Sequence, residues 1–327
     1  MGVKKKTKRG GHKQKLAIEH NGLYPYLLRY LEVSRIEGMS EATITRRDSA
    51  LRQFILWCDE FGLNEPQSIT KPILERYQRH LYYYRKADGD PLSASSQNVA
   101  LSAIKMLFRW LARENYLLYN PASELRIPKR SKQLPRYILS IEQVMEIQAQ
   151  ADLQTASGVR DRTILELLYA TGVRRTELCE LRVDGIDYER CALLIRSGKG
   201  NKDRYVPTGE RAAAWLRRYT LEVRSSLLTD LNDVALFLTD YGEPYTSSSL
   251  GRMVKRYIKQ ADIDVTGSCH LFRHAMATHM LENGADVRYI QAILGHSGLE
   301  TTQIYTHVSI NQLQHIHAST HPSCRKP

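Results

Sequence analysis

A short basic segment divides this chain into two halves of different character. The run RIPKRSKQLPR, residues 126 to 136, contains two prolines and five basic residues. Proline lacks a backbone N–H and clashes with the preceding turn, so a helix cannot continue through the run. The run also offers no apolar face to a core. It therefore predicts a linker between two domains, in a chain whose 327 residues suit about two.

From about residue 22 to 120 the apolar residues recur at helical spacing. We expect one helix over residues 41 to 61 with Ser40 as its cap, a second with Thr70 as its cap and Pro72 in its first turn, and a third over Ser93 to Arg113. One face of the first helix gathers the apolar residues Ile44, Leu51, Phe54, Ile55, Cys58 and Phe61. These stripes predict a helical domain with its own core.

After the linker the pattern becomes mixed. Ser140, with Gln143 three residues later, predicts a helix start, and DRTILELLYATGVRRTELCEL predicts a helix, a tight turn at Gly172 and another helix. CALLIR and DRYVP predict two short strands around the turn SGKGNK, and VALFLT a third strand; the rest is expected to be helical through about residue 317. The fold class is therefore mostly α with a small antiparallel β-sheet.

Charge indicates the class of partner, and cysteine usage indicates the cellular compartment. The net charge of +12 favours a polyanion, nucleic acid before a membrane. Residues 1 to 15 hold seven of the basic residues and no acid, which suits either a solvated tail or an arm that grips phosphates. No run approaches the roughly 20 apolar residues that span a bilayer. The five dispersed cysteines indicate reduced thiols, so we expect a cytoplasmic protein.

The second half contains a set of cationic, imidazole and phenol side chains. Its members are Arg174 after TGV, Lys199 in the turn SGKGNK, His270 and Arg273 in HLFRHAMATHML, His296 in LGHSGLE and Tyr305 in TTQIYTHV. No carboxylate cluster suits Mg²⁺ and no ligand set suits zinc, so we expect no metal and no cofactor. Such a set suits phosphoryl transfer, in which guanidinium groups neutralise developing charge and a tyrosine attacks phosphorus.

On the motifs TGVRRTELCEL, GKGNKDRYVP and HLFRHAMATHMLENGADVRYIQAILGHSGLETTQIYTHV, the chain resembles the tyrosine site-specific recombinases. This family includes the phage integrases and the bacterial Xer recombinases. Six reactive positions match in order, and the resemblance covers about residues 22 to 318. It implies an enzyme for integration, excision or resolution that cleaves and rejoins DNA without a metal, through a 3′-phosphotyrosyl intermediate.

The resemblance assigns roles to the cationic residues. Arg174 and Arg273 would hold the scissile phosphate, and Glu177 would help to orient them. Arg174 is preferred to the neighbouring Arg175 because it directly follows TGV. Lys199, at the tip of the predicted hairpin, would protonate the leaving 5′ oxygen.

The remaining roles fall on two histidines and one tyrosine. His270 would take part in proton transfer, His296 would hydrogen-bond the phosphate, and Tyr305 would be the nucleophile. Gly295 would let the backbone turn sharply before His296. A relaxing topoisomerase and a DNA-binding regulator without catalysis are the competing interpretations; the linear order of the motifs disfavours the first, and the complete reactive set disfavours the second.

The resemblance also implies an organisation for the whole chain. We expect a basic tail over residues 1–21, a helical core-binding domain over 22–125, a linker over 126–138, a catalytic domain over 139–318 and a C-terminal tail over 319–327. The two domains would clamp double-stranded DNA, and four subunits would join two sites, with a paralogous recombinase as a possible partner and no membrane involved. The basic extension points to a mobile-element integrase, while the motifs are also Xer-like.

Overall fold

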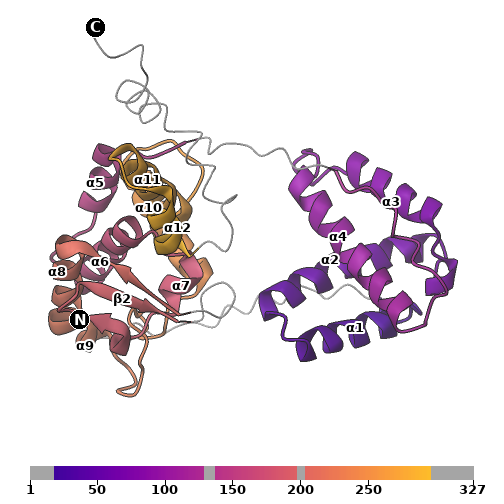
Figure 1. Ribbon diagram of the computed structural model, residues 1–327, viewed down its shortest axis with the longest axis horizontal. Helices are drawn as coiled ribbons and strands as arrows, with labels where there is room; N and C mark the ends of the chain where they lie inside the picture. The colour runs from indigo at the N-terminus through magenta and orange to yellow at the C-terminus, as the bar shows by residue number, and fades with distance from the viewer. Residues whose placement is uncertain (1–17, 129–136, 197–202, 296–327) are drawn as a thin grey trace, which may run out of the picture. The chain divides into compact units, whose positions relative to one another are not determined.

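The computed structural model describes residues 18–128, 137–196 and 203–295. Contacts divide the chain into two compact units between residues 132 and 133. One unit contains the described residues 18–128 and the other contains residues 137–295; Figure 1 draws the first in indigo to magenta and the second in magenta to yellow. Each unit is described by itself.

Helices build the first unit. They are α1 (Tyr24–Ile36), α2 (Glu41–Glu60), the short 3₁₀ turn η1 (Pro66–Ser68), α3 (Lys71–Tyr83) and α4 (Ala94–Arg113). The predicted cap at Ser40 is confirmed, because its hydroxyl oxygen accepts a hydrogen bond from the backbone N–H of Thr43. Ser93 caps α4 in the same way, through the backbone N–H of Ser96. The predicted cap at Thr70 is wrong in its chemistry: Thr70 occupies the N-cap position of α3, but its side chain makes no capping hydrogen bond.

The core of the first unit is aromatic. Phe54 of α2 packs edge-on against Tyr77 of α3 and Phe108 of α4, with ring centroids 4.9 and 6.3 Å apart. The predicted apolar face of α2 is buried from Ile44 to Cys58, but Phe61 lies just beyond the helix and is 43% exposed. The guanidinium of Arg76 covers the Phe61 ring instead, 4.1 Å from its centroid, so the prediction of a core position was wrong there.

The second unit surrounds one buried helix with further helices and a small sheet. Its helical elements are α5 (Ile141–Ala149), α6 (Ala156–Thr171), α7 (Arg175–Cys179), the 3₁₀ turn η2 (Val183–Gly185), α8 (Gly209–Arg218), the π-helical turn η3 (Tyr219–Val223), α9 (Arg224–Leu227), α10 (Ser247–Gln260), α11 (Cys269–Glu282) and α12 (Val287–Leu294). Its strands are β1 (Ile186–Asp187), β2 (Ala192–Ile195) and β3 (Arg204–Pro207). The expected mostly α class with a small antiparallel sheet is confirmed.

Two local predictions hold at the start of this unit. Ser140 and Gln143 form the predicted capping box at the start of α5. Gly172 ends α6 with φ at 57°, in the left-handed region that favours glycine. A Cβ atom there would lie 2.7 Å from Cε of Met276 and 2.9 Å from Cδ2 of Leu294. Glycine is thus required both by the backbone and by the packing of α11 and α12 against the turn.

The sheet has the order β1-β2-β3, with both pairs antiparallel. Leu193 pairs with Val206 and Ile195 pairs with Arg204, so the predicted strands CALLIR and DRYVP form a hairpin. The third strand was predicted wrongly: it is β1, and VALFLT makes only isolated bridges at Ala235 and Leu238. VALFLT runs through the core instead, where three consecutive residues are fully or almost fully buried rather than alternating: Leu236, Phe237 and Leu238.

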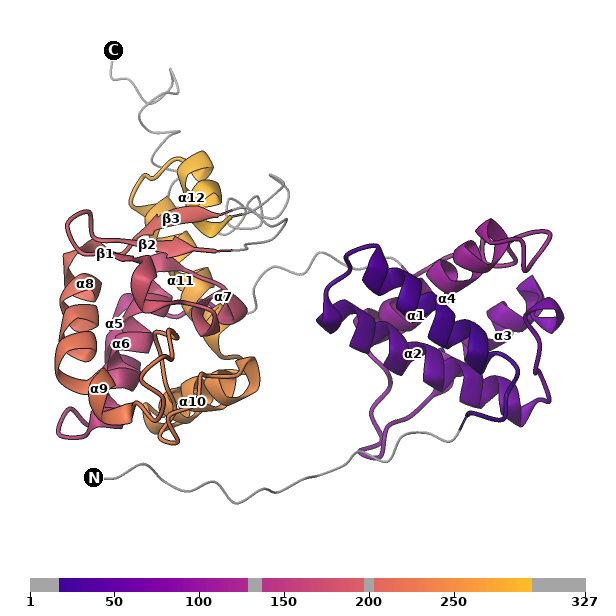
Figure 2. The same cartoon turned by 90° about the horizontal axis from the view of Figure 1, so that it is seen from below.

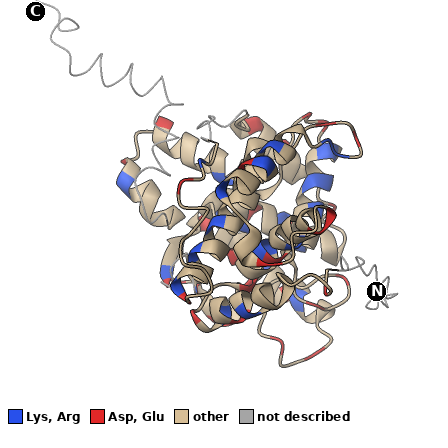
Figure 3. Cartoon of the chain, turned by 90° about the vertical axis from the view of Figure 1, so that its right-hand side faces the viewer, with Lys and Arg blue, Asp and Glu red and all other residues tan. Residues whose placement is uncertain are grey.

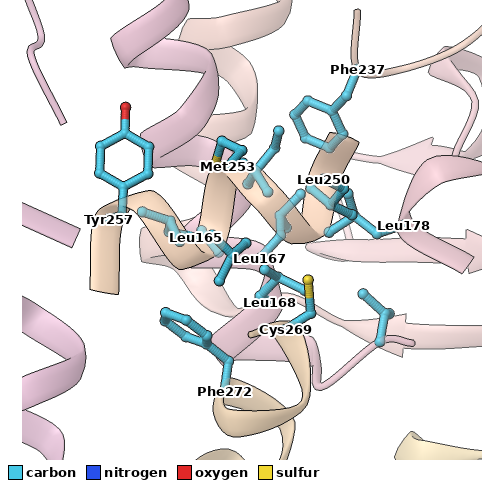
Figure 4. Close-up of a cluster of buried hydrophobic side chains, with 14 of the residues drawn as sticks. Leu165, Leu167, Leu168, Leu178, Phe237, Leu250, Met253, Tyr257, Cys269 and Phe272 are labelled. Atoms are coloured by element: carbon cyan, nitrogen blue, oxygen red, sulfur yellow. The ribbon is translucent and has the colours of Figure 1, made fainter. Parts of the chain in front are cut away.

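Helix α6 lies at the centre of the second unit and is buried along most of its length. Its residues Leu165, Leu167 and Leu168 meet side chains from several elements around it, among them α7, α10 and α11 (Figure 4). Burial of this many apolar side chains is the main stabilising contribution in such a domain. Helix α6 matters for the site because it sets the positions of two elements: the turn that leads into α7, and α11, which packs beside it.

Two further sequence predictions concern the cysteines and membranes. Cys58, Cys179, Cys191 and Cys269 are free thiols, while Cys324 lies outside the described residues. Across residues 18–128, 137–196 and 203–295, no helix is both long and apolar enough to cross a membrane.

Candidate active site

Arg174 and Glu177 form the first element of the site, at the start of α7. Arg174 is the N-cap residue of this helix, and Glu177 occupies the third helical position. The Glu177 carboxylate accepts one hydrogen bond from the Arg174 backbone N–H at 2.9 Å and another from its Nη1 at 2.6 Å. Nη2 of the same guanidinium donates to the carbonyl of Gly295 at 2.8 Å. These hydrogen bonds hold the Arg174 side chain in one orientation at the start of α7.

Arg273 joins the same place from α11. It is only 6% exposed. Its Nη1 donates to the carbonyl of Gly172, and its Nη2 donates to the carbonyl of Leu294 at 2.9 Å. Arg174 and Arg273, 99 positions apart in the sequence, are thus brought to adjacent carbonyls at the end of α12.

Glu177 is a buried anion held by two arginines. It is 5% exposed. Burial by itself raises the pKa of this carboxyl, but hydrogen bonds from Arg204 and from the Arg174 backbone outweigh burial and lower the pKa to about 2. The carboxylate is therefore charged over the whole physiological range and gives the two guanidinium groups a fixed counter-ion.

Arg204 is a residue of the site that our sequence analysis missed. It is the first residue of β3 and pairs across the hairpin with Ile195. Its Nη1 and Nη2 donate to both oxygens of Glu177 at 3.1 and 2.8 Å, and its Nε donates to the Ile293 carbonyl at 3.2 Å. Only its place in the motif GKGNKDRYVP marked it, because its partners lie 27 and 89 positions away.

His270 lies one helical turn before Arg273 on α11, as the i, i+3 spacing predicted. Partial burial and the surrounding guanidinium groups, Arg175 the strongest among them, lower the pKa of His270 below its ordinary value. The imidazole is therefore neutral at pH 7 and able to accept a proton. Arg175 itself runs along α10, where a Cβ atom on Gly251 would lie 3.1 Å from its Nη1.

Three predicted residues lie outside the described part of the chain: Lys199, His296 and Tyr305. The described flanks nevertheless define their sequence context. Lys199 lies between the paired strands β2 and β3, and His296 directly follows Gly295, whose φ of 62° ends α12 in the left-handed region. The predicted sharp turn at Gly295 is confirmed. Figure 2 shows α12 beside β3, so these two flanks belong to one side of the unit.

Metal chemistry has no candidate centre in the described ranges, where no three His, Cys, Asp or Glu side chains group as ligands. What the described site offers is positive charge on Arg174, Arg204 and Arg273, one buried carboxylate and a neutral imidazole. Such a site can bind a phosphate and stabilise negative charge that develops on its oxygens.

The chain thus has a helical unit followed by a mixed unit, in which the buried Arg273 and the partly buried Arg174 donate to the last carbonyls of α12. The phage integrase family model matches residues 138–312, and the model of the phage integrase N-terminal SAM-like domain matches residues 26–117. This chain belongs to the phage integrase family.

Curated relatives agree with this assignment. The chain is 52% identical to tyrosine recombinase XerC 2 of Ralstonia nicotianae over 94% of its own length and 88% of that protein. It is 37% identical to tyrosine recombinase XerD of Pseudomonas putida, covering 94% and 99% of the two chains. The chain is therefore an enzyme that recombines DNA site-specifically by strand cleavage and rejoining through a phosphotyrosyl intermediate.

Two solved structures of recombinases share the fold of this chain. The XerA recombinase is 31% identical, with a TM-score of 0.51 over 91% of this chain and 99% of that one. The XerH recombinase, bound to its palindromic difH substrate, has a TM-score of 0.69 at 23% identity, covering 89% of this chain and 83% of that one. The second likeness concerns the fold alone.

Proposed function

We propose that Arg174 and Arg273 hold the scissile phosphate of a DNA recombination site while Tyr305 attacks it. The observation that carries this proposal is the convergence of the two guanidinium groups on neighbouring carbonyls at the end of α12. An arginine has five N–H donors in a planar fork, which suits recognition of a phosphate. Tyr305 follows ten residues after Gly295, close enough in sequence to serve the same phosphate.

The proton transfers are assigned to the remaining residues. Lys199 protonates the leaving 5′ oxygen, and His296 hydrogen-bonds a phosphate oxygen. His270 accepts or returns a proton, a role that its lowered pKa supports because the ring is neutral at pH 7. Glu177 keeps Arg174 in place.

Substitution of Lys199 tests this chemistry. We expect Lys199→Ala to cleave normal DNA poorly, because the 5′ alkoxide then leaves without a proton donor. A substrate with sulfur in place of the leaving 5′ oxygen needs no donor, so cleavage should recover to near the wild-type rate. Single-turnover formation of the covalent adduct on both substrates measures this. Equal loss on both substrates would assign Lys199 to phosphate binding instead.

We further propose the domain boundaries of the sequence analysis: tail 1–21, core-binding domain 22–125, linker 126–138, catalytic domain 139–318 and C-terminal tail 319–327. The described helical unit then supplies DNA contacts, and the mixed unit supplies chemistry. Exchange between two duplexes needs cleavage of four strands, which supports a tetramer of this chain, or of this chain and a paralogue, on two sites. The protein would be a mobile-element integrase, which the basic residues 1–21 favour, or an Xer-like recombinase, which the motifs favour.

The distribution of charge supports a role in DNA binding for the basic segments. Residues 1–17 hold seven Lys and Arg and residues 129–136 hold four, with no acid in either segment. These two segments therefore account for eleven of the net charge of +12. In the described helices Lys and Arg are interspersed with Asp and Glu (Figure 3).

Deletion of residues 1–15 should therefore flatten the salt dependence of DNA binding. Each phosphate contact contributes about 0.9 to the slope of log K against log salt, so loss of several contacts should lower the slope by several units. Titration of a labelled recombination site at a series of salt concentrations measures the slope. An unchanged slope would show that the tail makes no phosphate contacts.

A further inference from the structure

Three arginines cap the end of α12. Three consecutive carbonyls accept from three guanidinium groups: Ile293 from Arg204 at 3.2 Å, Leu294 from Arg273 at 2.9 Å and Gly295 from Arg174 at 2.8 Å. The last carbonyls of a helix lack partners within the helix, and the helix dipole favours cations there. The cap therefore fixes α12 to the phosphate-holding arginines.

Arg204 differs from Arg174 and Arg273 in the partners of its two Nη groups. Its two Nη atoms face the two oxygens of Glu177, a fork against a carboxylate, while its Nε reaches α12. The side chain is 15% exposed. All three nitrogens are thus engaged by protein groups in the described structure, so Arg204 connects parts of the site: β3, the start of α7 and the end of α12.

Gly295 makes room for this side chain. A Cβ atom on Gly295 would lie 2.8 Å from Cζ and 3.0 Å from Nε of Arg204. Such contacts are shorter than van der Waals distance, so the guanidinium would have to move away from α12. Glycine at this position therefore serves the approach of Arg204 as well as the left-handed turn.

We propose that Arg204 is a positioning residue for strand cleavage, which acts by fixing Glu177, and through it Arg174, against the end of α12. The inference rests on the proposed role of Arg174 as a phosphate-holding residue. Arg204 itself need not touch DNA. Lysine cannot replace it, because a single ammonium cannot bind both carboxylate oxygens and the Ile293 carbonyl in one plane.

Loss of Arg204 has a distinctive consequence for pH. Glu177 faces Arg174 at the start of its own helix and Arg204 on β3, and the carbonyl end of α12 lies across from both. Removal of Arg204 leaves burial to raise the pKa of Glu177 from about 2. A carboxylate with a lowered pKa acts above that pKa and is lost as pH falls, so the acid limit of cleavage should move to higher pH in the variant.

The experiment compares Arg204→Lys and Arg204→Gln with a matched control, Arg224→Gln. Arg224 also binds backbone carbonyls, those of Asp233, Ala235 and Leu236, away from the site. Single-turnover adduct formation on a nicked recombination site is followed from pH 5 to pH 8, beside melting temperature and DNA affinity. His270 titrates in all these proteins, so the ratio of variant to wild-type rates isolates the change at Glu177.

We expect both Arg204 variants to cleave on the order of 100-fold more slowly at pH 7.5, as small misplacements of catalytic groups do. The ratio of the Arg204→Gln rate to the wild-type rate should fall further at acid pH, while DNA affinity stays nearly unchanged. Arg204→Lys should fold well, as its melting temperature reports, yet not recover the rate. Arg224→Gln should lower melting temperature and leave the pH profile as in the wild type.

A double variant separates action through Glu177 from a general effect. If Arg204 acts through Glu177, Glu177→Gln with Arg204→Gln should be little slower than the slower single variant, because coupled residues are not additive. The inference would be overturned if the rate losses of the two single variants add fully in the double variant, or if Arg204→Lys cleaves at the wild-type rate. It would also be overturned if the pH profile of Arg204→Gln equals that of Arg224→Gln. In each case the wild-type protein still cleaves, so the proposed function stands. Absence of an adduct from the wild type would overturn the proposed function, and the inference with it.

Discussion

Tyr305→Phe should abolish the covalent protein–DNA adduct completely while DNA affinity stays within about twofold of the wild type. The substitution removes one hydroxyl and keeps the ring, so packing and charge are conserved. Without that oxygen no bond to phosphorus can form, and no neighbouring group in the proposed site substitutes for it. Denaturing electrophoresis of a labelled nicked site measures the adduct, and a filter-binding titration measures affinity.

Tyr289 provides the matched control for this variant. It lies on α12 and is 71% exposed, and it has no part in the proposed chemistry. Tyr289→Phe should form the adduct at the wild-type rate. If Tyr289→Phe abolishes the adduct and Tyr305→Phe retains it, the nucleophile has been assigned wrongly.

Arg273→Ala should slow cleavage by about 10²–10³-fold, the loss typical when one donor to a developing oxyanion is removed. The change also leaves the carbonyls of Gly172 and Leu294 without this donor in a buried place. An unsatisfied buried polar group costs about 1–3 kcal/mol, so the melting temperature should fall as well. Single-turnover cleavage well below that temperature separates the two effects.

Arg273→Lys distinguishes charge from geometry in the same position. Lysine keeps the positive charge but cannot reach a carbonyl on each side and a phosphate together. We therefore expect most of the rate loss to persist in this variant. A rate close to the wild type would show that only net charge matters at residue 273, and that the observed fork to Gly172 and Leu294 has no catalytic consequence.

The sequence predicted those parts of the fold that local chemistry determines. Caps at Ser40 and Ser140 depend on residues three positions apart, and the turn at Gly172 depends on one glycine before a helix start. A prediction that depended on tertiary surroundings was wrong. VALFLT has the composition of a strand, yet it runs through the core, where consecutive residues are buried, and it forms only isolated β-bridges.

The site divides in the same way. Arg174, Glu177, His270 and Arg273 belong to short motifs. The structure brings Arg174 and Arg273 to the end of α12, with Glu177 bound to Arg174 and His270 under the influence of both guanidinium groups. The role of Arg204 depends on Glu177 and Ile293, which are distant in sequence, so no spacing rule could reveal it. Lys199, His296 and Tyr305 stay predictions that rest on the motifs.

Identification of the amino acid that carries the DNA tests the central claim most directly. The wild-type protein is trapped on a nicked recombination site in the presence of EDTA, digested, and the DNA-linked peptide is sequenced by mass spectrometry. We predict an adduct that forms without added metal, with the 3′ phosphate attached to Tyr305. A strict requirement for metal, or attachment to Tyr289 or any other residue, would contradict the account.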